Sequence, residues 1–263
     1  MRAPDGTVFD LHGSLEAPVV ALIHGLGLCR HLWVRHLPAL SARYRVLNYD
    51  LYGHGDSAPP PSEASLTVYS DQLAGLLDHV GVARASVVGF SIGGMINRRF
   101  ALDHGNRLAS LVILNSPHDR GEEAQQAVED RARSVREQGA LSTMDAALAR
   151  WFTPGFRVAN AQAQQMVREW RLKADAESYA QAAWVLANGV RELIRPASPI
   201  TASTLVMTCE NDSGSTPAMS HAIAAEIPGA ETIILDDLQH LGLTEQPAAF
   251  TAPILEFLER THP

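Results

Sequence analysis

Short apolar runs alternate with amphipathic stretches along most of the chain. Such runs are typical of strands buried on both faces, and they occur at 7–11, 18–23, 44–49, 85–88, 108–114, 203–207 and 231–235. Apolar residues at helical spacing predict helices between them, over 30–42, 66–80, 92–104, 217–227 and 248–260. Regular alternation of strand and helix is typical of the α/β class, so we expect a mostly parallel sheet with helices on both faces.

The alternation breaks after Asn115. Residues 121–195, called the inserted segment below, are rich in Ala, Gln, Arg and Glu and read as helical throughout. We therefore expect a core formed by residues 1–120 and 196–263, with a helical cap over residues 121–195. The large apolar residues of this cap could pack against one another, and they could also line a pocket as a lid.

The strongest chemical signal is the stretch from Val87 to Met95, which reads Val-Val-Gly-Phe-Ser-Ile-Gly-Gly-Met. It predicts a buried strand that turns into a helix through the pattern Gly-x-Ser-x-Gly. Gly89 and Gly93 lack a Cβ, which allows a sharp turn and close packing of strand and helix. Ser91 would then present its hydroxyl at the tip of the turn, as a nucleophile does in this kind of elbow.

A serine nucleophile needs a histidine base, and the base needs an acidic group that fixes its tautomer. His240 follows the last predicted strand and is the best candidate base. Asp212 follows the preceding strand and is the favoured acid. Three rival acids stay open: Asp119 before the inserted segment, and Asp236 and Asp237, which lie close to His240 along the chain.

An acyl-transfer intermediate also needs two N–H donors for its oxyanion. The backbone N–H of Ile92 opens the helix after the serine, where the helix dipole favours negative charge. The second donor should come from the glycine-flanked loop after the strand over 18–23, and Leu26 is our candidate because its N–H follows the bend at Gly25. We expect His24 to hold this loop through hydrogen bonds rather than to react.

Composition narrows the class of function. The chain has 263 residues and a formal net charge of −8, so no basic face is expected and nucleic-acid binding is disfavoured. Cys29 and Cys209 form no metal motif, and no His, Cys or Asp cluster has ligand spacing, so we expect no metal and no cofactor. The chain shows no signal peptide and no apolar run that could span a bilayer, which favours a cytoplasmic protein without a membrane partner. A homodimer is a candidate assembly.

Together these motifs resemble the α/β-hydrolase superfamily over nearly the whole chain. The matching stretches are His24-Gly25-Leu26-Gly27, residues 50–57, the elbow at Ser91, Glu210-Asn211-Asp212 and the loop at His240. The resemblance implies the α/β-hydrolase fold and a cofactor-independent serine hydrolase that forms an acyl-enzyme on Ser91. Its substrate would be a small carboxylic ester or lactone.

The inserted segment is similar to the cap of the 3-oxoadipate enol-lactonase group. The similarity lies in Arg150-Trp151-Phe152-Thr153-Pro154, with Arg131 and Gly139 before it and Tyr179 after it. In that group the cap faces a small lactone that bears a carboxylate. The resemblance therefore implies that Arg131, Arg150 and Trp151 bind substrate, because arginine grips a carboxylate bidentately. A solvent-exposed cap arginine is the alternative for each.

Other functions stay open on the sequence. A carbon–carbon bond hydrolase of aromatic ring-cleavage products would use the same triad. A ligand-binding protein without catalysis could share the fold, because a fold does not fix a function. A haloalkane dehalogenase is disfavoured, since its nucleophile is an aspartate and this chain has Ser91 there.

Overall fold

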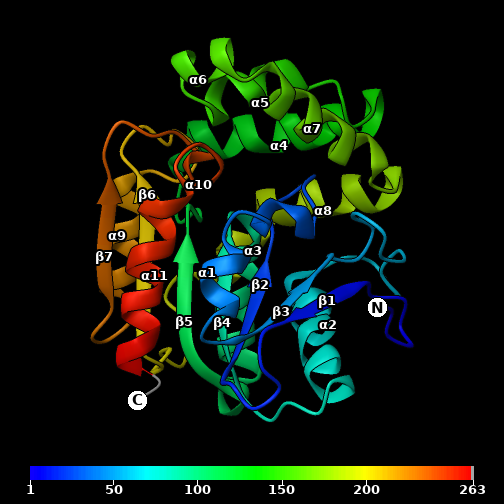
Figure 1. Cartoon of the computed structure of the whole chain (residues 1–263). Helices are drawn as coiled ribbons and strands as arrows, with labels where there is room; N and C mark the ends of the chain where they lie inside the picture. The colour runs from blue at the N-terminus through cyan, green and yellow to red at the C-terminus, as the bar shows by residue number, and fades with distance from the viewer. Residues whose placement is uncertain (262–263) are drawn as a thin grey trace.

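The computed structural model of the chain describes residues 1–261, and a seven-stranded sheet runs through this part in the order β1-β3-β2-β4-β5-β6-β7 (Figure 1). The strands are Phe9–His12 (β1), Val19–Ile23 (β2), Arg45–Tyr49 (β3), Ala85–Phe90 (β4), Leu108–Leu114 (β5), Thr204–Cys209 (β6) and Glu231–Leu235 (β7). β1 pairs antiparallel with β3, and the other neighbouring strands pair parallel. The predicted α/β class with a mostly parallel sheet is confirmed.

Helices cover both faces of the sheet, as predicted. These helices are Leu37–Ser41 (α1), Leu66–His79 (α2), Ile92–Asp103 (α3), Pro217–Ala225 (α9), Gly242–Glu245 (α10) and Pro247–Thr261 (α11), with 3₁₀ turns at Arg30–Trp33 (η1) and Gly105–Arg107 (η2). α1 and α11 lie on one face, in front of the sheet in Figure 1. α2, α3 and α9 contribute to the apolar core on the other face.

The central strands divide their side chains between these two cores. In β4, Val87 packs into the core with α2 and α3, whereas Val88 and Phe90 pack into the core with α1 and α11. Successive strand residues point to opposite faces of a sheet, so a strand covered on both sides must be apolar at nearly every position. This explains why the buried strands read as continuous apolar runs.

The single helix predicted over 30–42 is wrong. The structure has η1 over Arg30–Trp33 and a separate short helix α1 over Leu37–Ser41. Pro38 lies in the first turn of α1. Proline has no N–H to donate and its ring clashes with the preceding turn, so it is tolerated at a helix start and breaks a longer helix.

The inserted segment lies over the carboxyl ends of the strands, at the top of Figure 1. It contains Gly121–Gln138 (α4), Met144–Trp151 (α5), Pro154–Ala159 (α6), Ala161–Lys173 (α7), Ala176–Asn188 (α8) and the 3₁₀ turn Gly189–Leu193 (η3). α8 lies between the sheet and the other helices of the segment. Backbone bonds tie the segment to core loops: Asp175 N–H donates to the Gly53 carbonyl at 2.9 Å, and Leu241 N–H donates to the Trp151 carbonyl at 2.8 Å.

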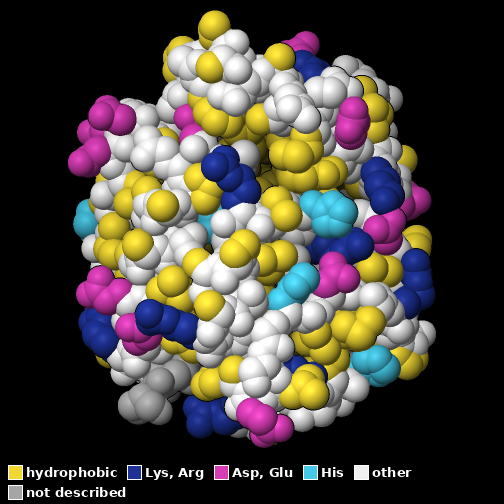
Figure 2. Space-filling view, viewed as in Figure 1, with side chains coloured by type: hydrophobic (Ala, Val, Ile, Leu, Met, Phe, Trp, Pro, Cys, Tyr) yellow, Lys and Arg dark blue, Asp and Glu magenta, His cyan; other side chains and the backbone are white. Residues whose placement is uncertain are grey.

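The surface is mixed in charge. Acidic and basic side chains are scattered over the face shown in Figure 2, and hydrophobic side chains gather between the upper helices and the core. None of the helices in residues 1–261 combines the length and the apolar character that crossing a bilayer requires.

Candidate active site

Ser91 lies at the turn between β4 and α3 with a backbone φ of +58°, a conformation that is strained for a residue with a side chain. The flanking glycines make this turn possible. A Cβ on Gly89 would lie 2.1 Å from the Gly93 carbonyl oxygen, and a Cβ on Gly93 would lie 2.6 Å from the Ile23 carbonyl oxygen. The turn is held by the Ser91 N–H, which donates to the Leu114 carbonyl at 2.8 Å.

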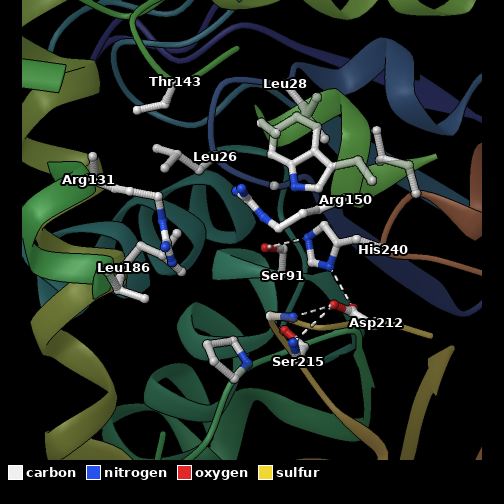
Figure 3. A pocket seen from close by; sticks show the side chains of 18 of the residues that line it. Leu26, Leu28, Ser91, Arg131, Thr143, Arg150, Leu186, Asp212, Ser215 and His240 are labelled. Carbon is white, nitrogen blue, oxygen red and sulfur yellow. Dashed lines mark hydrogen bonds and ion pairs between the residues drawn. The ribbon is translucent and has the colours of Figure 1, made fainter. Parts of the chain in front are cut away.

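The structure brings Ser91, His240 and Asp212 together at the carboxyl ends of β4, β6 and β7 (Figure 3). The Ser91 Oγ lies 3.1 Å from His240 Nε2. His240 Nδ1 lies 2.6 Å from an Asp212 carboxylate oxygen. An ionised carboxylate only accepts, so Nδ1 carries the proton and Nε2 is free to accept from the serine hydroxyl. This is the arrangement that a general base needs.

Asp212 is buried and accepts from four donors. Besides His240, these are Asn115 Nδ2 at 2.9 Å and the N–H groups of Gly214 at 2.9 Å and Ser215 at 3.0 Å. Burial alone would raise the pKa of Asp212, but the charge and hydrogen bond of His240, with the bonds from Asn115 and Gly214, outweigh it and lower the pKa. The carboxylate is therefore held ionised beside the imidazole.

The rival acids lie elsewhere. Asp119, Asp236 and Asp237 are exposed. Asp119 accepts from the Gly121 N–H at 3.0 Å, which makes it part of the turn that leads into α4. Of the four candidate acids, only Asp212 forms a hydrogen bond with His240 among the residues described.

The candidate oxyanion donors flank the serine. Ile92 is the first residue of α3, so its N–H has no acceptor within the helix. Leu26 lines the same cavity as Ser91 and is visible beside it in Figure 3. The assignment of Leu26 and Ile92 as oxyanion donors stays a prediction.

His24 is buried beneath this loop. Burial, helped by the neighbouring His54, lowers its pKa to about 4, so the ring is neutral. Its Nε2 accepts from the Leu51 N–H at 3.0 Å, and Nδ1 therefore carries the proton that it donates to the Gly25 carbonyl at 2.8 Å. These two bonds fix the start of the loop, which is the role that we expected of His24.

The cavity above Ser91 encloses about 140 Å³ and is lined by the core and by the inserted segment. Four arginines line it, namely Arg120, Arg131, Arg150 and Arg171. Asp212 is the acidic residue in its wall among the residues described, and its carboxylate is already committed to His240. Two rings pack against the base: Phe90 at 4.9 Å and Trp151 at 5.9 Å between ring centroids.

Arg131 and Arg150 approach the cavity from different helices, α4 and α5. In Figure 3 the Arg150 side chain reaches over Ser91, and Arg131 enters from the opposite wall. Neither guanidinium has an ion-pair partner within residues 1–261. Arg131 is exposed, as the alternative for it allowed, and Arg150 is half-buried. Partial burial lowers the pKa of both guanidinium groups; the charge of Arg150 lowers the pKa of Arg131 further, whereas the charge of Asp212 opposes the shift of Arg150. Arg120 differs, because it donates to the carbonyls of Leu186 and Ala187.

Two residues of this site were missed at the sequence level. Asn115 follows β5 directly, as Asp212 follows β6, so its place at the carboxyl edge of the sheet could have indicated it. Arg171 gives no such signal, because it is one of several arginines in a polar helix.

Within residues 1–261 no group of three or more His, Cys, Asp or Glu side chains could hold a metal ion. Cys29 and Cys209 are buried free thiols, and burial raises the pKa of each to about 12.

Comparisons with known proteins identify the family and the fold. The sequence model of the alpha/beta hydrolase family matches residues 20–253. The chain is 27% identical over 249 residues to 3-oxoadipate enol-lactonase 2 of Acinetobacter baylyi, covering 94% of this chain and 91% of that protein. It is similar to the solved enol-lactonase of Burkholderia xenovorans LB400, with a TM-score of 0.88, 28% identity and 96% of both chains covered. A thermophilic esterase of Thermogutta terrifontis, solved with malate bound, gives a TM-score of 0.85 at 28% identity over 98% of this chain and 94% of that one.

Proposed function

The chain belongs to the alpha/beta hydrolase family, and on that premise we propose that it hydrolyses a small carboxylic ester or lactone through an acyl-enzyme on Ser91. The observation that carries the proposal is the hydrogen-bonded series Ser91–His240–Asp212, which opens into a cavity. The fold brings together three groups that are far apart in the chain, in the order that nucleophilic acyl transfer uses.

In the first half of the reaction, His240 Nε2 takes the hydroxyl proton of Ser91 as the oxygen attacks the carbonyl carbon. The electron pair of the carbonyl bond moves onto its oxygen, and the N–H groups of Leu26 and Ile92 stabilise this oxyanion. When the carbonyl re-forms, the alcohol oxygen leaves and takes the proton from His240. A lactone would open at this step and stay attached through its acyl end.

In the second half, His240 removes a proton from water as the water attacks the acyl-enzyme. The new acid leaves, and Ser91 recovers its proton from the imidazolium. Asp212 stays ionised throughout and stabilises the protonated imidazole. The low pKa of Asp212 supports this role, because the group carries its charge at neutral pH.

We further propose that residues 121–195 act as a cap that selects substrates bearing a carboxylate. Arg131 and Arg150 would hold that group, and Trp151 would form the apolar wall beside His240. Two arginines without ion-pair partners favour an anion in the cavity. The similarity to enol-lactonases and to an esterase solved with malate bound supports the same substrate class.

Hydrolysis of p-nitrophenyl acetate and butyrate by the wild type and by Ser91→Ala tests the reaction. We expect turnover by the wild type and a loss of roughly 10⁴-fold or more in the variant. Turnover that survives in Ser91→Ala would remove the nucleophile from the proposal. If the wild type is inert, ring-cleavage diketones test a carbon–carbon bond hydrolase, and a ligand that is bound without turnover would indicate a binding protein.

Carboxylate selection is tested by the ratio of kcat/KM for monomethyl glutarate to that for methyl butyrate. Loss of a charged hydrogen-bond partner in Arg150→Met should lower this ratio by about tenfold or more. Arg133→Met is the matched control, because Arg133 is an exposed arginine on α4 that pairs with Glu129 and Asp130. An unchanged ratio in Arg150→Met would contradict the role of Arg150.

A further inference from the structure

We propose that the cavity contains a second anion-binding subsite, formed by Arg171 and Thr143, and that the substrate carries two negative groups besides its scissile carbonyl. This inference rests on the proposed hydrolase function and extends its substrate class. In this proposal Arg131 and Arg150 bind the first carboxylate of the substrate. Arg171 and Thr143 bind the second carboxylate at a different part of the cavity wall.

Arg171 lies in α7 and is only 2% exposed, yet it lines the cavity. Aromatic rings cover its guanidinium, with its central carbon 4.9 Å from the centroid of Trp151 and 5.5 Å from that of Tyr179. Such rings stabilise a cation through their faces but offer no hydrogen-bond acceptor there. The N–H groups, which lie in the plane of the guanidinium, must find acceptors between the rings.

Within residues 1–261 those acceptors are reduced to one threonine hydroxyl. Arg171 Nε is buried without a hydrogen-bond partner. Its Nη1 reaches only the Thr143 hydroxyl, at 3.5 Å, which is the outer limit for such a bond. Burial lowers the pKa of Arg171, and the charges of Arg150 and Arg168 lower it further, against the opposing effect of Tyr179. A buried cation with unmet donors is costly, and an anion in the cavity would satisfy it.

The balance of charge in the cavity wall points the same way. Of its four arginines, Arg120 donates to backbone carbonyls, whereas the other three have no carboxylate partner among the residues described. Asp212 accepts from His240 and offers them no salt bridge. A single substrate carboxylate would leave this pocket with a large excess of positive charge, and a second negative group would reduce it.

The subsite is also separate from the group over the nucleophile. In Figure 3 the Arg150 side chain reaches over Ser91, whereas Thr143 lies apart from it, on the far side of Leu26. A carboxylate between Arg171 and Thr143 could accept in-plane N–H bonds from the guanidinium and an O–H bond from the threonine. Because a carboxylate bound there would lie away from Ser91, the cavity would select a substrate whose two negative groups are attached to different carbons.

Three methyl esters test the inference: methyl butyrate without a carboxylate, monomethyl glutarate with one, and the monomethyl ester of propane-1,2,3-tricarboxylate with two. Proton release at neutral pH gives kcat/KM for each. We expect the wild type to prefer the dianion over the monoanion by about tenfold or more, as a charged hydrogen bond is worth that factor. Arg171→Met should abolish this preference, and Thr143→Val should reduce it by roughly threefold.

Arg168→Met is the matched control. Arg168 lies on the same helix, is partly exposed and pairs with Asp145 outside the cavity wall, so its loss should leave the preference unchanged. The inference is overturned if the wild type does not prefer the dianion, or if folded Arg171→Met keeps the preference. If Arg171→Met does not fold, Thr143→Val decides, and an unchanged preference in that variant overturns the subsite.

Failure of the hydrolase proposal gives a different result. If the wild type hydrolyses none of the three esters, titration calorimetry with free propane-1,2,3-tricarboxylate and glutarate still tests the subsite. We expect tighter binding of the tricarboxylate by the wild type and loss of that difference in Arg171→Met. Equal affinities for the two acids in the wild type would overturn the subsite, whatever the reaction.

Discussion

The floor and the roof of the cavity differ in how their charged groups are paired. In the floor, formed by Ser91, Asp212 and His240, both carboxylate oxygens of Asp212 accept hydrogen bonds. In the roof, formed by Arg131, Arg150 and Arg171 of the inserted segment, no guanidinium has a carboxylate partner among the residues described. The charged groups of the floor therefore have their partners in the free protein, whereas the guanidinium groups of the roof do not.

This difference separates two tasks. Groups that stabilise a transition state act best when they are fixed before the substrate arrives, because no reorganisation is then needed. Groups that select a substrate gain most when their partner is the substrate itself. We therefore expect changes in the floor to lower turnover for every substrate, and changes in the roof to alter the preference among substrates.

The largest expected effect comes from the floor. Asp212→Asn should lower kcat by roughly 10⁴-fold on neutral and charged esters alike, because the amide favours the wrong tautomer of His240. Asp119→Asn is the control, since Asp119 is exposed and accepts from the Gly121 N–H at the start of α4. Steady-state kinetics of both variants decide the assignment of the acid. A large loss in Asp119→Asn with a small loss in Asp212→Asn would reverse it.

A smaller effect on turnover is expected at Gly27, where the loop that carries Leu26 contacts the inserted segment. Its φ is +69°, and a Cβ there would lie 2.8 Å from the Tyr179 ring and 3.1 Å from Arg171 Nε. Gly27→Ala should push the loop that carries Leu26 away from the inserted segment and lower kcat by about 100-fold if Leu26 is an oxyanion donor, because small displacements of reacting groups are costly.

The control for Gly27→Ala is Gly139→Ala. Gly139 has a φ of +88° but nothing within 4 Å of its Cβ position, so this variant carries the backbone strain without the contact. It should lose stability and keep its kcat. Equal kcat values for the two variants would show that the contact between loop and inserted segment does not matter for turnover.

The smallest expected effect on turnover concerns a neutral group of the core. Burial lowers the pKa of His36 to about 4. Its Nδ1 lies 2.7 Å from the Thr251 hydroxyl oxygen, and because that hydroxyl donates to the Pro247 carbonyl, Nδ1 is the donor. Between pH 6.5 and 4 the unfolded chain binds a proton that the folded chain excludes, so stability is full above this window and falls as the pH decreases through it. The loss from this group is roughly 3 kcal/mol at most.

Urea unfolding at several pH values checks this prediction. His36→Gln should lose part of the pH dependence between pH 6.5 and 4, because glutamine binds no proton there. Its kcat at neutral pH should stay close to that of the wild type, since His36 is not part of the cavity wall. An unchanged slope of stability against pH would mean that folding does not shift the pKa of His36.

The sheet and the turn at Ser91 could be predicted from the sequence because both produce recognisable short residue patterns. A strand covered on both faces must be apolar. The turn between β4 and α3 needs glycine at Gly89 because a Cβ there would meet the carbonyl of Gly93 four residues on, whereas the contact of Gly93 is with Ile23 of β2 and is local only in the motif, not in the chain. The place of Asp212 and His240 followed from a topological rule, since the ends of parallel strands share one edge of the sheet. Helix breaks were harder, because Pro38 outweighed an otherwise helical pattern.

The roof could not be predicted in the same way. The packing of Arg171 between Trp151 and Tyr179 joins three helices of the inserted segment, and the spacing of these residues in the chain has no fixed period. Arg131 and Arg150 were named only through a resemblance to a family. Helical patterns predict which face of a helix is buried, but they do not predict how polar helices are oriented over a cavity.

The connection of the inserted segment to the sheet has an evolutionary consequence. The segment leaves the core after β5, and Arg120, directly before it, donates to the carbonyls of Leu186 and Ala187 near the other end of the segment. The chain therefore enters and leaves the segment at neighbouring points. A recombination event could replace the whole segment without moving Ser91, Asp212 or His240, so this lineage could acquire new substrates by exchanging one piece of gene while inheriting its chemistry intact.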